Sequence, residues 1–444
     1  MRSRSYIEEH QQYRPPQRDG QQADESGIDS AYPQVSHPKP IKDYRGMLSS
    51  QALSQALPKV VESGVSHTLS HSNCQPPHGQ ISNRMVATLF YRSKSFHTHT
   101  AFPDRSPDQL HFPKDVTSQS GSPEPPLDPK PLDHFYGSYI SPLCLTSFLD
   151  LISSLPLPPG STHLCSSHRC LDTLIHPRVV ELTFSPAPDS NYLTLSDLRK
   201  HELLYHFEHE WNLDIVLQPD TPFRRYPRLV VFDMDSTLIQ QEVIDLIAAS
   251  IGVEPQVSAI TKRAMAGELD FSSSLRERVA LLKGVDSNIF HTLRSTITVT
   301  PGARQLIHAL RRLGVKTAVL SGGFIPLTQW LAEELGIDYA HANSLVSIDG
   351  KLTGEVSGTI VDADRKALLL VEIARKENID LSQVIAIGDG ANDLLMMKKA
   401  ALGVAFNAKP KVQFEAGARL NGESLLDFLF LLGFTAEEID TLIS

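Results

Sequence analysis

The sequence has little cysteine, no long apolar run and no excess of positive charge. Its 444 residues include four cysteines, none beyond residue 170, which excludes a dense disulfide framework. No stretch approaches the roughly 18 consecutive apolar residues that a membrane-spanning helix requires. The formal net charge of −10 disfavours non-specific nucleic-acid binding, which needs a basic face. We therefore expect neither a membrane nor a nucleic acid as a partner.

The first residues also lack the features of a targeting signal. The start, MRSRSYIEEHQQYRPPQ, has no apolar core for secretion, and its early acidic residues and prolines argue against a mitochondrial presequence. These observations predict a cytoplasmic protein.

Proline is unevenly distributed along the chain. Fifteen of the 30 prolines precede residue 131, in a region also rich in Ser, Gln and His. Such a composition buries too little apolar surface to offset the ordering entropy, so residues 1–132 are predicted to be mostly disordered. The exception is 85–91, MVATLFY. It could be a strand that pairs with a later segment or an apolar stretch within a linker, and we favour the strand.

Residues 133–226 have the pattern of a small α/β module. Apolar spacing predicts helices over 143–152 and 195–211, and strands over 178–184 and 213–217. A module of this size is typically regulatory or architectural, and we expect an accessory role.

Two groups in this module could suggest a metal site. Cys165, His168 and Cys170 have a spacing that matches no common zinc pattern, so we expect a structural or bystander role. His201, His206 and His209 do not share one helix face well, so we expect them on the solvated surface.

From residue 227 onward, apolar strands alternate with amphipathic helices. This alternation predicts an α/β fold with a doubly wound parallel sheet, whose ligands bind at the carboxyl ends of the strands. Residues 229–232 form one predicted strand, and 318–320, 384–387 and 403–406 each lie in a further one; the clearest helices are 303–313, 327–335 and 366–377.

Polar groups follow the predicted strands or begin a helix. Asp233 and Asp235 follow the first strand, and two carboxylates so close together require a compensating cation or proton. The others are Ser321-Gly322-Gly323, Lys366, and Asp389, Asn392 and Asp393. Taken singly, each has an ordinary explanation as a helix cap, a turn or a solvated lysine. Their order along four elements is more specific.

Seven segments in sequence order extend this pattern over about 229–430. They are FDMDSTLIQQEVID, AMAGELDFSSSLRERVALLKG, VLSGGF, AHAN, DGKLTGEVSG, RKALL and AIGDGANDLLMM. Together they resemble the phosphoserine phosphatase family of the haloacid dehalogenase-like hydrolases.

The resemblance implies a role for each strand-end residue. Asp233 would be the nucleophile and Asp235 the acid and base. Ser321, Lys366 and the Gly322 amide would hold the phosphoryl oxygens. The implied cofactor is Mg²⁺, with ligands from Asp233, the Asp235 carbonyl, Asp389 and Asp393.

The interval 239–316 is too long for an ordinary crossover between strands. It contains predicted helices at 255–266, 271–283 and 287–294, which indicates an inserted helical cap over about 245–300. A cap closing over the strand ends would exclude water and contact the leaving group.

The resemblance also implies a substrate pocket beneath the cap. Glu242 and Arg278 would bind the serine amine and carboxylate, Met265 and Phe271 would form an apolar wall, and Asn392 would lie near the substrate. Alternatives remain open from the residues alone. Arg278 could pair within its helix, Glu242 could complement the helix dipole, and the two apolar residues could be cap core.

By resemblance, the expected activity is Mg²⁺-dependent hydrolysis of phosphoserine through an aspartyl-phosphate, in serine biosynthesis. The alternatives are a related phosphatase or phosphotransferase for another small phosphorylated amino acid or alcohol, and a regulator with a vestigial phosphatase fold. The four intact motifs argue against the last. The resemblance also makes a homodimer an expectation, and serine binding to 133–226 a hypothesis.

Overall fold

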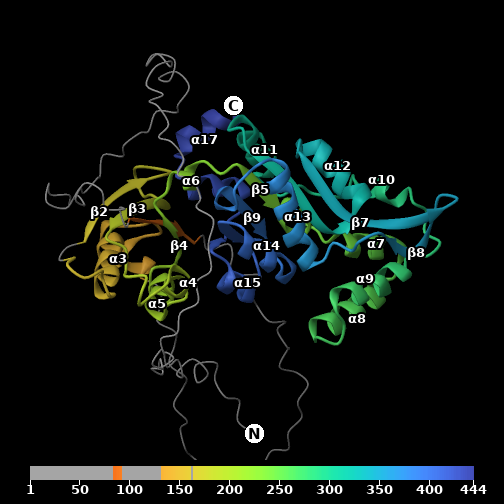
Figure 1. The fold of residues 1–444 in the computed structure, drawn as a ribbon, viewed down its shortest axis with the longest axis horizontal. Coiled ribbons are helices and arrows are strands. Elements are labelled where there is room, and N and C mark those ends of the chain that lie inside the picture. Colours follow the sequence, from red (N-terminus) through yellow and green to blue (C-terminus); the bar gives the residue numbers. More distant parts are fainter. Residues whose placement is uncertain (1–83, 93–131, 162–163) are drawn as a thin grey trace, which may run out of the picture. The chain divides into compact units, whose positions relative to one another are not determined.

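The computed structural model describes residues 84–92, 132–161 and 164–444, and these residues form two β-sheets (Figure 1). One sheet has four strands and the other has seven. The predicted disorder of 1–132 concerns residues that, apart from 84–92 and 132, lie outside this described part.

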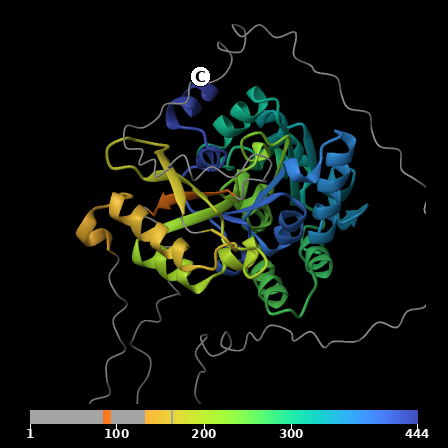
Figure 2. The same cartoon turned by 60° about the vertical axis from the view of Figure 1, so that its left-hand side comes forward.

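The four-stranded sheet has the order β2-β3-β1-β4. Its strands are β1 (Met85–Tyr91), β2 (Cys165–Cys170), β3 (Val179–Ser185) and β4 (Leu213–Pro219). Strand β1, orange in Figure 2, pairs antiparallel with both β3 and β4, and all seven of its residues are buried. The interpretation of 85–91 as a strand is confirmed. The sheet thus takes an inner strand from upstream of residue 133.

Alternate residues of β1 serve two different cores. Met85, Ala87 and Leu89 join a cluster with residues of the helices α3 (Pro142–Ser154) and α5 (Glu202–Glu210). Phe90 instead belongs to the cluster that contains the C-terminal apolar segment 428–434. Because successive side chains of a strand point to opposite faces, this one strand contributes to both clusters.

The helix predicted over 195–211 is in fact two helices, α4 (Leu195–Arg199) and α5. The break occurs at His201, whose backbone is extended and whose Nδ1 accepts a hydrogen bond from Leu203 N at 3.2 Å. A side chain that caps a new helix in this way satisfies a free amide at its start. The apolar spacing alone did not reveal this cap.

The seven-stranded sheet has the order β11-β10-β9-β5-β6-β7-β8, and all its pairs are parallel except β7–β8. This arrangement confirms the predicted α/β fold with a doubly wound sheet. The strands are β5 (Leu229–Phe232), β6 (Lys316–Phe324), β7 (Tyr339–Ile348), β8 (Lys351–Ser357), β9 (Val384–Gly388), β10 (Leu402–Phe406) and β11 (Ala418–Leu420).

Helices cover both faces of this sheet. On β5, Val230 and Phe232 share a core with α11 (Ala303–Arg312) and α12 (Ile325–Leu335). Leu229 and Val231 belong to a second core, with α13 (Ala363–Lys376) and α14 (Leu394–Lys399). A strand buried on both faces has a continuous apolar sequence, which is why 229–232 could be recognised. The three helices predicted in this region are confirmed.

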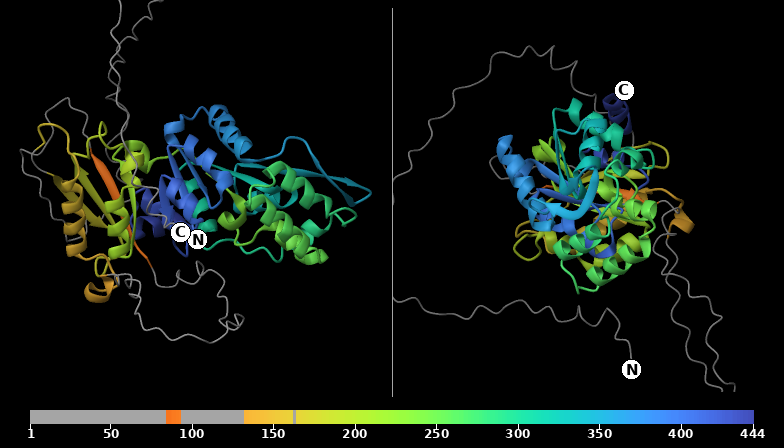
Figure 3. Two further views of the ribbon diagram at one scale, coloured as in Figure 1. Left: turned by 90° about the horizontal axis from the view of Figure 1, so that it is seen from below. Right: turned by 90° about the vertical axis from the view of Figure 1, so that its right-hand side faces the viewer.

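Between β5 and β6, four helices precede α11 and form the cap. They are α7 (Val243–Ile251), α8 (Glu254–Met265), α9 (Phe271–Ala280) and α10 (Ile289–Leu293). The β7–β8 hairpin lies beside them (Figure 3), and Gly284 N donates to Leu352 O at 2.7 Å. The predicted cap helices are present, although α9 and α10 are shorter than expected. In the described part of the chain, no helix has the length and apolarity needed to cross a membrane.

Candidate active site

The carboxyl ends of β5, β6 and β9 lie side by side, because β5 pairs with both of the others. Asp233 directly follows β5, Asp389 directly follows β9, and Ser321 lies within the last residues of β6. A cavity of about 370 Å³ opens here between these strand ends and the cap helices. The strand pairing therefore brings together motifs that are up to 160 residues apart in sequence.

Three carboxylates meet at the floor of the site. Asp233, Asp389 and Asp393 each offer an oxygen, and these oxygens all lie within 4.8 Å of one another. Burial, followed by repulsion from Asp233, raises the pKa of Asp389 to about 7. The same two causes raise the pKa of Asp393 well above its usual value, against the opposing charge of Lys366. Such a cluster requires additional positive charge to be fully ionised.

Lys366 supplies part of that charge. It is fully buried, and its Nζ lies 2.8 Å from Oδ1 of Asp233 and 2.8 Å from Oδ1 of Asp393. Burial alone would lower the pKa of this ammonium, but Asp233 and Asp393 raise it above its ordinary value. The lysine comes from the first turn of α13, where Asp362 caps the helix by accepting from Arg365 N. Lys366 is therefore held as a cation between two motifs.

Asp235 lies in an irregular loop between β5 and α7. The next residue, Ser236, has φ of +54°, and Oδ2 of Asp235 accepts a long hydrogen bond of 3.4 Å from Val243 N. Oδ1 is buried and has no hydrogen-bond partner among the residues that the structure describes. Burial, then Glu242 and Asp233, raise the pKa of Asp235 well above its usual value. A buried carboxyl group that favours its proton has the chemistry of an acid catalyst.

The Ser321-Gly322-Gly323 segment belongs to the last part of β6, which ends at Phe324, in agreement with the expectation that the strand ends in this segment. Pairing with β7 shifts register between Leu320 and Phe324. Ser321 is fully buried, and its Oγ accepts from Gly323 N at 2.8 Å. A Cβ on Gly322 would lie 3.1 Å from the Phe271 ring, so a larger residue would crowd the cap.

Asn343 is a supporting residue to which the sequence analysis gave no role. It is fully buried in the middle of β7, and its Nδ2 donates to Gly322 O at 2.8 Å. Its Oδ1 accepts from Val361 N, also at 2.8 Å. Asn343 thus ties the β6 strand end to the segment before α13. The sequence did contain a signal, because Asn343 is the last residue of AHAN, one of the seven segments that resemble the family, but no role was assigned to it there.

Most of the predicted substrate-binding residues border the cavity: Glu242, Met265, Phe271, Arg278, Gly322 and Asn392. Ser321 and Lys366, which were also predicted to bind the substrate, are fully buried and are not among the lining residues. Glu242 accepts from Ser236 Oγ at 2.9 Å, and Arg278 Nε donates to Ser274 O at 3.3 Å. The alternative of an intrahelical partner for Arg278 is thus observed together with a place at the cavity. Met265 is 70% exposed, so it is not part of a cap core.

The cluster of oxygen donors could hold a divalent metal ion. Carboxylate oxygens are the ligands that hard dications prefer, and a dication here would offset the repulsion among Asp233, Asp389 and Asp393. In the described ranges, these three residues form the only group of His, Cys, Asp and Glu side chains close enough to do so.

The other suggested metal residues do not form such a site. Cys165 and His168 stand three residues apart on β2, so their side chains leave opposite faces of the sheet. His206 and His209 are exposed on α5, as predicted, and His201 is its cap.

The fold and the acidic strand-end site define the class of the chain. A family model described as haloacid dehalogenase-like hydrolase matches residues 230–398. This interval includes Asp233, Asp235, Ser321, Lys366 and the Asp389–Asp393 loop.

Individual proteins of similar sequence indicate a narrower family than this family model does. A phosphoserine phosphatase of Streptomyces coelicolor is 51% identical over 228 residues, which are 51% of this chain and 56% of that protein. This chain therefore aligns with little more than half of that relative. A probable phosphoserine phosphatase of Schizosaccharomyces pombe is 47% identical over 229 residues, 51% of this chain and 77% of that protein. The chain belongs to the phosphoserine phosphatase family of the haloacid dehalogenase-like hydrolases.

A solved structure has the same fold over a larger share of the chain. The unliganded crystal structure of a probable phosphoserine phosphatase from Vibrio cholerae is similar with a TM-score of 0.52 at 32% identity. The similarity covers 68% of this chain and 86% of that one.

Proposed function

We propose that this protein hydrolyses O-phospho-L-serine to L-serine and phosphate in serine biosynthesis, with Mg²⁺ as its cofactor. The observation that carries the proposal is the composition of the cavity. Asp233 borders its floor and is paired with the fully buried Lys366, and its walls have one carboxylate, Glu242, and one guanidinium, Arg278. A zwitterionic amino acid needs one anion and one cation at fixed positions, and its phosphate needs positive charge at the floor.

In the first chemical step, a carboxylate oxygen of Asp233 attacks phosphorus and the bond from phosphorus to the serine oxygen breaks. Asp235 gives its proton to that oxygen, so L-serine leaves as an alcohol. The unpartnered, buried Oδ1 of Asp235 and its raised pKa suit this role. The product on the protein is an aspartyl-phosphate.

In the second step, Asp235 accepts a proton from a water molecule, whose oxygen attacks the aspartyl-phosphate. The Asp233 carboxylate is restored and phosphate leaves. Lys366, Ser321 and the Gly322 amide orient the phosphoryl oxygens throughout, because catalysis of this reaction consists mainly of positioning and charge neutralisation. Mg²⁺, held by Asp233, the Asp235 carbonyl, Asp389 and Asp393, would supply the charge that lets an anion approach the carboxylate.

The test is phosphate release from phosphoserine, phosphothreonine, phosphoethanolamine and an aryl phosphate, with Mg²⁺ and after treatment with a chelator. We expect phosphoserine to have the highest kcat/KM, and chelation to remove activity that Mg²⁺ restores. A higher kcat/KM for another phosphate ester would contradict phosphoserine as the substrate. Full activity after exhaustive chelation would contradict Mg²⁺ as the cofactor.

A further inference from the structure

Lys409 is a cation of the cavity that lies outside the motifs discussed above. It follows β10, at the start of α15 (Pro410–Glu415), and lines the same cavity as Glu242, Arg278 and Asp389. Its side chain is exposed, and within the described part of the chain its ammonium makes no ion pair. Glu242 and Asp389 both lie within its electrostatic influence. An unpaired ammonium at the border of a cavity is available to a ligand.

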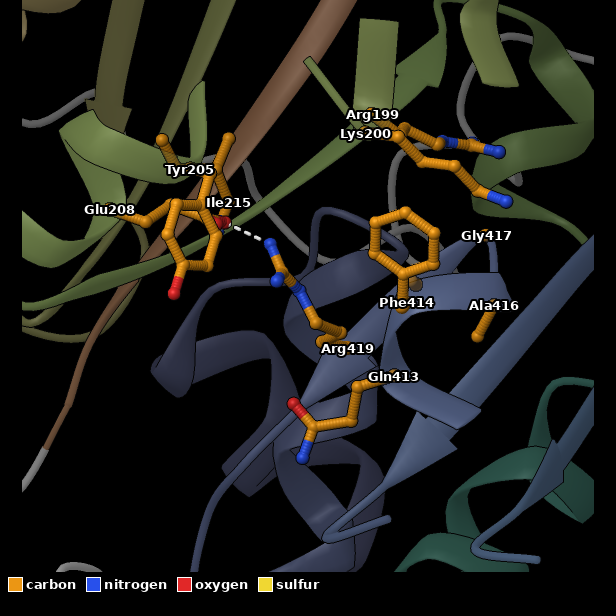
Figure 4. A pocket seen from close by; sticks show the side chains of 11 residues that line it. Arg199, Lys200, Tyr205, Glu208, Ile215, Gln413, Phe414, Ala416, Gly417 and Arg419 are labelled. Carbon is orange, nitrogen blue, oxygen red and sulfur yellow. Dashed lines mark hydrogen bonds and ion pairs between the residues drawn. The ribbon is translucent and has the colours of Figure 1, made fainter. Parts of the chain in front are cut away.

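The backbone at Lys409 is held firmly by α15. The amides of Val412 and Gln413 donate to Lys409 O at 2.9 and 3.0 Å, and Gln413 Nε2 donates to Ala408 O at 2.6 Å. At the other end of the helix, the Lys200 ammonium lies 4.7 Å from the centre of the Phe414 ring (Figure 4). The position of Lys409 is thus fixed by the sheet domain, independently of the cap.

Arg278 also lines the cavity and makes no ion pair with the residues that the structure describes. It belongs to the cap helix α9, whereas Lys366 is already bound to Asp233 and Asp393. Phosphoserine has three charged groups that the cavity must bind: a phosphate, an ammonium and a carboxylate. If Glu242 binds the ammonium, the carboxylate still has two oxygens that can each accept a charge-assisted hydrogen bond.

We propose that Lys409 is a specificity-determining residue, which binds the carboxylate of the substrate from the sheet side while Arg278 binds it from the cap. This inference rests on the proposed function, because it assigns a partner to one group of the proposed substrate. The carboxylate would then bridge the two parts of the site. A substrate without a carboxylate would lose this bridge, so Lys409 would favour amino-acid phosphates over amino-alcohol phosphates.

The test compares Lys409→Gln with Lys411→Gln on two substrates. Phosphoethanolamine has the phosphate and the amine of phosphoserine but lacks the carboxylate. Lys411 is a matched control, because it is an exposed lysine of the same helix that does not line the cavity. Lys409 makes no side-chain cap of α15, so its replacement leaves the helix start intact. Thermal melting of both variants verifies their folding.

We expect Lys409→Gln to lower kcat/KM for phosphoserine about tenfold, the scale of one charge-assisted hydrogen bond, mainly through KM. The value for phosphoethanolamine should change less than about twofold, as should both values in Lys411→Gln. Where turnover of phosphoethanolamine is slow, its inhibition constant against an aryl phosphate gives the same comparison. Lys409→Arg should retain the preference for phosphoserine over phosphoethanolamine, because it keeps the positive charge.

Equal losses on both substrates would overturn the proposal, since Lys409 would then act on the phosphate. An unchanged kcat/KM of Lys409→Gln on both substrates would overturn the proposal as well. Failure of the proposed function has a different signature, because the unaltered protein would then show no preference for phosphoserine.

Discussion

The ammonium nitrogen of Lys366 lies 2.8 Å from Oδ1 of Asp233, with both side chains buried. The same nitrogen contacts Asp393 at an equal distance. One lysine therefore connects the strand end of β5 with the loop after β9. This ion pair offsets the negative charge of Asp233, the proposed nucleophile, and also joins two separate segments of the fold.

Replacing Lys366 should affect both activity and stability. Lys366→Ala leaves Asp233 and Asp393 buried without their cation, which costs about 3–5 kcal/mol when a buried ion pair is broken. Loss of a charge that stabilises the transferring phosphoryl group should lower kcat by about 10³-fold or more. Steady-state kinetics and urea unfolding measure the two effects. Arg375→Ala, an exposed site on the same helix, should change neither. Activity of Lys366→Ala within tenfold of the unaltered protein would contradict this account.

Asn343 should contribute to rate by positioning Gly322. Asn343→Ala removes the hydrogen bonds to Gly322 O and from Val361 N. A displaced phosphate-binding amide should lower kcat roughly 10- to 100-fold, because small misplacements near the reacting atoms are costly. Kinetics at a temperature well below the melting midpoint separates this effect from unfolding. The control is Asn288→Ala, at an exposed cap residue without a side-chain capping bond. An unchanged kcat in Asn343→Ala would exclude the positioning role.

Arg419 should stabilise the fold without taking part in the chemistry. Its guanidinium pairs with the buried carboxylate of Glu208, on α5 (Figure 4). Arg419→Ala should lower the free energy of unfolding by about 3 kcal/mol, since Glu208 would lose its counter-charge. The kcat of the folded variant should stay within about twofold, because Arg419 does not line the catalytic cavity. Urea unfolding measures the change, with the exposed Arg276→Ala as control. A decrease of less than about 0.5 kcal/mol in the free energy of unfolding would show that the Arg419–Glu208 pair is not needed for stability.

Cys144 should be unreactive in the folded protein. It is buried in α3, and burial raises the pKa of its thiol to about 12. Because the thiolate is the reactive form, almost none of it is present at pH 8. Mass-spectrometric mapping after iodoacetamide treatment should find Cys144 unmodified without denaturant and modified in urea. Rapid native modification would mean that this helix opens easily.

The local spacing of apolar residues was sufficient to predict much of the fold. The run 229–232 is apolar on both faces, and α11 has a clear apolar stripe, so both were predicted correctly. Strand β2 was missed because its sequence, CSSHRC, lacks apolar alternation and depends on pairing with β3. The site motifs were recognisable because each lies at the end of a strand or begins a helix. The role of Asn343 depends on long-range hydrogen bonds and the proposed role of Lys409 on its place at the cavity, and no local spacing encodes either.

The central claim is that Asp233 is the nucleophile of phosphoserine hydrolysis, and its most direct test is phosphate release by Asp233→Asn. The amide is nearly the same size as the carboxylate but cannot attack phosphorus effectively. We predict that phosphate release from phosphoserine with Mg²⁺ falls to the background rate, while the variant stays folded as judged by circular dichroism. Phosphate release at an ordinary rate by the folded variant would contradict the account.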